Sequence, residues 1–106
     1  MGDRAVIARE GEEKGVYVHW AGDLLPALEQ IVARDGVEKA TDTLLAHHWS
    51  NVRPDATGRT LEHAELIEGY GNAYTDLDGA EPVCMDVSDF PAYFIGADGT
   101  VRSSDG

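Results

Sequence analysis

The sequence has few basic residues, one cysteine and no long apolar run, and each shortage excludes a class of protein. Its apolar runs reach only four or five residues, whereas a membrane-spanning helix needs roughly 20. No basic segment followed by an apolar one opens the chain, so we expect no secretory signal and no membrane association. The single cysteine, Cys84, cannot form a disulfide within the chain and is expected to be a small buried side chain. A small chain of this kind is typical of the cytoplasm.

Lysine and arginine are missing altogether from residues 60–101. The chain carries 20 acidic and 8 basic residues, for a net charge of −12. The window without bases contributes −9 of this charge, and the other 64 residues contribute −3. Contacts to phosphates need a basic surface, so direct binding of nucleic acid is not expected. The natural complement of this charge is a basic protein surface.

The strongest strand signal is the β-branched and aromatic segment at residues 16–20. Side chains alternate between the two faces of a strand, so Val16, Val18 and Trp20 share one apolar face. We expect this face to point into the core. Tyr17 and His19 then lie on the opposite face, where their polar tips can reach water or a ligand.

The chain opens with an apolar run at residues 5–8, followed by a polar, glycine-containing loop that leads into residues 16–20. This order predicts an antiparallel hairpin. The two segments around it read Gly2-Asp3-Arg4-Ala5 and Val16-Tyr17-Val18-His19-Trp20-Ala21-Gly22. They resemble a family of small uncharacterised proteins from bacteria and bacteriophages, which share a Gly-Asp/Asn-Arg-Ala start and a Val-Tyr-x-His-Trp-x-Gly segment. The resemblance covers about the first third of the chain, implies a fold and a phage setting, and carries over no catalytic residue.

Two amphipathic helices are predicted after this hairpin. Apolar residues recur with the helical period through residues 24–35, with Asp23 as N-cap, Pro26 in the first turn and Gly36 at the end. A second apolar stripe predicts another helix over residues 37–50, which Pro54 would stop.

The second half of the chain is predicted to contain strands. Residues 61–74 fit either a short helix or a strand, and the glycines near its end favour a strand at 64–70. Further strands are expected at 83–87, 92–96 and 100–102, with turns at 76–79 and 97–99. The prediction is therefore a single α+β domain over residues 1–106, with an antiparallel sheet of four to six strands and two helices on one face.

No motif for catalysis, a metal or another cofactor stands out. Adjacent positions on a helix point about 100° apart, so His47 and His48 cannot both ligate one ion from a single helix face. The pair Asp76 and Asp78 lacks the later oxygen ligands of a calcium loop. No nucleophile signature surrounds Cys84 or any serine, so an enzyme is the less favoured class.

The charge distribution supports the hypothesis that the chain is a non-enzymatic interaction protein. Its carboxylates would mimic the phosphates of a nucleic acid and occupy the basic groove of a nucleic-acid-handling protein, in the manner of a phage inhibitor. The predicted contact residues are Glu62, Glu65, Glu68, Asp76, Asp78, Glu81, Asp86 and Asp89. Two alternatives remain open: an acidic bias that only keeps the protein soluble, and a small-molecule binder or minor enzyme with a cleft near Tyr17 and His19.

Overall fold

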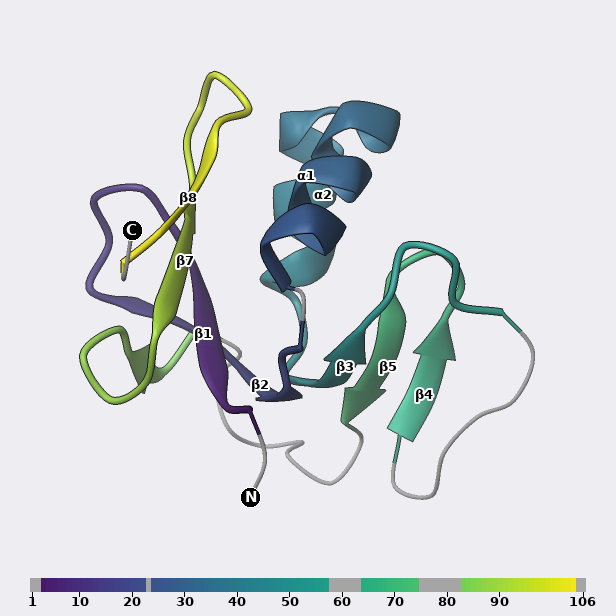
Figure 1. Ribbon diagram of the computed structural model, residues 1–106, viewed down its shortest axis with the longest axis horizontal. Coiled ribbons are helices and arrows are strands. Elements are labelled where there is room, and N and C mark those ends of the chain that lie inside the picture. The colour runs from purple at the N-terminus through teal and green to yellow at the C-terminus, as the bar shows by residue number, and fades with distance from the viewer. Residues whose placement is uncertain (1–2, 23, 58–63, 75–82, 105–106) are drawn as a thin grey trace.

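The fold is taken from a computed structural model, which describes residues 3–22, 24–57, 64–74 and 83–104 (Figure 1). Within these ranges it contains two helices and eight strands. The helices are α1 (Leu24–Asp35) and α2 (Val37–Leu44). The strands are β1 (Ala5–Arg9), β2 (Lys14–Trp20), β3 (Trp49–Val52), β4 (Ala64–Ile67), β5 (Gly71–Tyr74), β6 (Met85–Asp86), β7 (Ala92–Ile95) and β8 (Val101–Ser103).

The strands form one mixed sheet in the order β4-β5-β3-β2-β1-β7-β8, and the short β6 pairs with β2. The α+β class is confirmed, but the sheet is larger than predicted and is not wholly antiparallel. Strand β1 runs parallel to β7, and β2 runs parallel to β3. Parallel neighbours need a long crossover connection, which the two helices provide between β2 and β3. Local sequence patterns do not show which distant strands pair, so the prediction missed these two contacts.

The predicted hairpin at the start of the chain is confirmed. Strand β1 pairs antiparallel with β2, with Ala5 opposite Val18 and Ile7 opposite Val16. Gly15 allows the two backbones to approach closely, because a Cβ atom at this position would lie 2.1 Å from the Ile7 carbonyl oxygen. The strand pairing itself therefore requires a glycine at this position.

Helix α1 has the predicted bounds, and Gly36 follows it with a φ of 89°. The Gly36 N–H donates to the Val32 carbonyl and completes the last turn. The second helix is shorter than predicted, since it ends at Leu44 and residues 49–52 form β3. The buried Trp49 indole donates from Nε1 to the Leu44 carbonyl at 2.8 Å, which satisfies a carbonyl at the helix end. An apolar residue such as Trp49 fits the buried face of a helix or of a strand, so periodicity alone could not show that α2 ends before it.

The C-terminal strands differ from the prediction mainly in length. The choice of strand over helix near residue 64 is confirmed by β4, but a turn with Gly69 follows at once and leads into β5, which was not predicted. The strand predicted at 83–87 is only the two-residue β6. The last hairpin, β7 with β8, is confirmed with its turn. The predicted N-cap Asp23 and the turn at 76–79 lie outside the described residues.

The two faces of the sheet have different coverings. The face with Ile7, Val16 and Val18 packs against the buried stripes of both helices, which lie on that side of the sheet (Figure 1). The opposite face holds a smaller cluster of Val6, Ala8, Ala92 and Phe94, and the partly buried Met85, Val87 and Phe90 pack against it. The two helices therefore cover one face of the sheet, as predicted, and the main core lies between them and that face.

Two residues expected in the core are exposed. Trp20 is 52% exposed, although Val16 and Val18 on the same face are fully buried. Trp20 is the last residue of β2, whereas Val16 and Val18 lie within the strand and belong to the core cluster that packs against the helices. Cys84 is also exposed rather than buried.

None of the helices in the described part of the chain is long and apolar enough to cross a membrane.

Candidate functional site

Four of the eight acidic residues predicted to contact a partner lie in the described ranges. Glu65 is exposed on β4, and Glu68 is exposed in the turn that follows. Asp86 is half-buried on β6, and Asp89 is exposed shortly after it. The other four lie outside the described residues: Glu62, Asp76, Asp78 and Glu81.

The structure brings these four together only as two separate pairs. Strand β4 forms one edge of the sheet, whereas β6 pairs with the start of β2, and both β5 and β3 lie between β4 and β2. Strand β6 pairs only with Lys14 and Gly15 at the start of β2, away from the part of β2 that pairs with β3, and β5 separates β3 from β4. Glu65 and Glu68 therefore share no continuous patch with Asp86 and Asp89 among the described residues.

Most of the described basic residues are already paired with carboxylates. The ion pairs are Arg9 with Asp42, Lys14 with Asp86, Arg34 with Asp35, Arg53 with Asp55, and Arg102 with Glu10. Nine exposed acidic residues have no ion pair within the described ranges: Asp3, Glu12, Glu13, Glu29, Glu38, Glu65, Glu68, Asp89 and Asp98. Internal pairing thus engages five of the seven described bases and leaves a surface with excess negative charge.

Local hydrogen bonds lower the pKa of two exposed or half-buried carboxylates, those of Asp86 and Asp98. Hydrogen bonds from the Ser88 hydroxyl and backbone N–H to Asp86, with the charge of Lys14, lower the pKa of that carboxyl. The backbone N–H and the hydroxyl of Thr100 likewise lower the pKa of Asp98. Both groups therefore stay negative to a lower pH than an ordinary aspartate.

The alternative ligand residues, Tyr17 and His19, lie on the predicted face of β2 and contact each other. The Tyr17 hydroxyl is 2.7 Å from Nδ1 of His19, and burial raises the pKa of Tyr17. The Tyr17 ring also packs on Phe90, and the His19 ring packs edge-on against Trp20. The hydroxyl and one imidazole nitrogen are already engaged with each other, which reduces what this pair offers a ligand.

His48 contacts Cys84 but cannot activate it as a base. His48 is 6% exposed, and its Nδ1 accepts a hydrogen bond from the Tyr17 backbone N–H at 2.9 Å. A neutral ring that accepts at Nδ1 carries its proton on Nε2, the atom 3.6 Å from the Cys84 sulfur. That nitrogen can neither take the thiol proton nor bind a metal. Among the described residues, no three His, Cys, Asp or Glu side chains gather to hold a metal ion.

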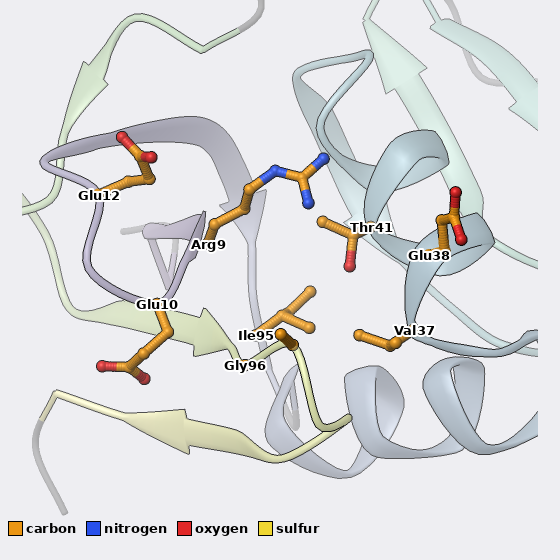
Figure 2. A pocket seen from close by; sticks show the side chains of 9 residues that line it. Arg9, Glu10, Glu12, Val37, Glu38, Thr41, Ile95 and Gly96 are labelled. Carbon is orange, nitrogen blue, oxygen red and sulfur yellow. The ribbon is translucent and has the colours of Figure 1, made fainter.

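A groove of about 360 Å³ lies elsewhere, between the β1–β2 turn, α2 and the end of β7 (Figure 2). Arg9, Glu10 and Glu12 line it from the hairpin side, and Thr41 lines it from α2. The sequence analysis did not single out these residues. The only sequence signal was the three glutamates at positions 10, 12 and 13, since no local pattern shows that α2 lies opposite this turn.

Comparison of the chain with models of protein families, with curated proteins and with solved structures gives no match.

Proposed function

We propose that this protein is a non-enzymatic interaction protein that engages a basic protein surface through its exposed carboxylates. The observation that supports this proposal is the imbalance of ion pairing. Five of the seven described bases are held by carboxylates, whereas nine exposed acids have no such partner in the described ranges. A net charge of −12 attracts a basic partner and steers its approach.

The proposal extends to the kind of partner. A protein that handles DNA or RNA has a basic groove for phosphates, and carboxylates on loops and strand edges can occupy it. Such an inhibitor, carried by a phage, would act in the host cytoplasm. This extension is supported by the charge and by the resemblance of the first third of the chain to small bacterial and phage proteins.

The predicted contact surface is tested with two variants of equal charge. One variant carries amides at Glu65, Glu68, Asp76 and Asp78. The control variant carries amides at four acids outside the predicted surface: Asp3, Glu12, Glu13 and Glu29. Both raise the net charge equally, so they differ only in where the charge is removed.

Each protein is used to capture partners from the native host at about 0.05 M and about 0.3 M salt, because exposed charges are screened more strongly at the higher value. We expect the wild-type protein to hold its partner only at low salt, the first variant to lose it and the control to keep it. Equal loss in both variants would show that bulk charge, not the predicted surface, is responsible. A partner retained equally at both salt concentrations contradicts the whole proposal.

A further inference from the structure

We infer that the groove between the β1–β2 turn and α2 binds a small zwitterion of the amino-acid type. Its carboxylate would lie against Arg9 and Thr41, and its ammonium group would lie at the acidic rim. This site shares no residue with the predicted partner contacts and does not rest on the proposed function.

One side chain that lines the groove has a buried hydroxyl without a hydrogen bond. Thr41 is 2% exposed, and its Oγ1 has no partner among the described residues. Leaving such a group unpaired costs about 1–3 kcal/mol. In Figure 2 the Thr41 side chain lies between the guanidinium of Arg9 and the side chains of Val37 and Ile95.

Arg9 supplies the second donor inside the groove. Its guanidinium has five N–H groups, and its hydrogen bond to Asp42 at 3.2 Å uses only Nη2. The Arg9 side chain is half exposed, and the ion pair with Asp42 that holds it is itself exposed, so the guanidinium can turn toward a ligand without breaking a buried contact. A ligand carboxylate placed here receives N–H donors from Arg9 and the hydroxyl of Thr41 together.

The start of α2 adds a third favourable feature for a carboxylate. Val37 and Glu38 from its first turn line the groove, and Gly36 before them supplies no side-chain cap. An uncapped helix start carries partial positive charge and N–H groups without helical partners. Arg9, Thr41 and the helix start together therefore favour an acceptor on the ligand.

The rim has the opposite character. Glu10 is occupied by Arg102 through two hydrogen bonds, but Glu12 and Glu38 have no ion pair within the described ranges. Figure 2 shows the Glu38 carboxylate pointing away from Thr41, and Glu12 on the other side of Arg9. These two carboxylates and the net charge of −12 repel a simple anion. A ligand that satisfies both regions must carry its own positive charge.

The apolar floor and the volume of the groove restrict the side chain and the size of the ligand. Val37 and Ile95 provide apolar surface for an aliphatic chain. A volume of about 360 Å³ lies at the small end of ligand pockets, which run from about 300 to 1,000 Å³. An α-amino acid with an aliphatic or basic side chain has this size, and a basic side chain adds a second charge for the rim.

The ligand class is tested by titrating the ¹⁵N-labelled protein with L-lysine, L-leucine, acetate and butylamine. We expect saturable amide shifts with both amino acids, stronger with lysine, centred on residues 9–12, 37–41 and 95–97. Acetate carries only the carboxylate and butylamine only the ammonium group, so each should bind at least tenfold more weakly. Acetate binding as tightly as the amino acids would overturn the zwitterion, and absence of saturable shifts with either amino acid would overturn the site.

The residues are tested with Thr41→Val, which keeps the shape of the side chain and removes the unpaired hydroxyl. We expect this variant to fold at least as stably as the wild-type protein and to bind lysine about fivefold to tenfold more weakly, the loss of one hydrogen bond. Thr43→Val, two residues along the same helix and outside the groove, is the matched control and should bind normally. Arg9→Gln should also weaken binding. Unchanged lysine affinity in both Thr41→Val and Arg9→Gln would refute the proposed carboxylate contact.

Discussion

The two tryptophans provide the sharpest test of the fold, because one is buried and the other is exposed. Trp49 is completely buried at the start of β3, stacks on Tyr70 with ring centroids 6.5 Å apart and donates to the Leu44 carbonyl. Trp20 is 52% exposed at the end of β2. We therefore expect Trp49→Phe to destabilise the protein far more than the matched control Trp20→Phe.

The magnitude for Trp49→Phe has two sources. The smaller ring leaves a cavity and loses buried area, which we place at about 1–2 kcal/mol, below the full truncation of a tryptophan to alanine. The Leu44 carbonyl loses its indole N–H donor, which adds about 1–2 kcal/mol for a buried unpaired group. The expected total is about 2–4 kcal/mol out of the roughly 5–15 kcal/mol typical of a domain. Trp20→Phe is expected to stay within about 0.5 kcal/mol.

Urea unfolding followed by circular dichroism measures both changes, and fluorescence checks the burial directly. In Trp20→Phe the remaining Trp49 should emit at short wavelength and resist quenching by acrylamide. In Trp49→Phe the remaining Trp20 should emit at long wavelength and be quenched readily. Equal destabilisation by the two substitutions, or an accessible Trp49, would refute the placement of β3 under the helices.

Three further outcomes are expected. Gly15→Ala should cost about 3 kcal/mol or more in urea unfolding, because its Cβ would overlap the Ile7 carbonyl; a loss below about 1 kcal/mol would show that the two strands can separate slightly at no cost. The hydrogen bond from Arg34, and then that from Tyr70, hold the pKa of Asp35 well below its ordinary value of 3.8. This carboxylate therefore contributes stability above about pH 4 that is lost as the pH falls further. Asp35→Asn should reduce the loss of unfolding free energy below about pH 4, measured by urea unfolding at several pH values. An unchanged loss would argue against the hydrogen bonds from Arg34 and Tyr70 to Asp35. Exposed Cys84 should react with a thiol reagent in the native protein at nearly the rate found in urea, and strong native protection would contradict its exposure.

The sequence by itself determined the local elements and the charge. Strand β2 and helix α1 were predicted from their periodicity, and the hairpins at both ends followed from polar turns between apolar runs. These features depend on residues that are near one another in the chain, so a local pattern is sufficient. The net charge of −12 needs no fold at all.

Only the tertiary structure decided where distant segments meet. Trp49 belongs to a strand because β2 offers it a parallel partner, and Trp20 is exposed although Val16 and Val18 in the same strand are buried. The groove likewise joins Arg9, Thr41 and Ile95, which are separated by at least 32 positions in the chain. Strand pairing and helix packing are contacts between segments far apart in sequence, and the free energy that selects among them comes from the burial they share, which no single segment displays.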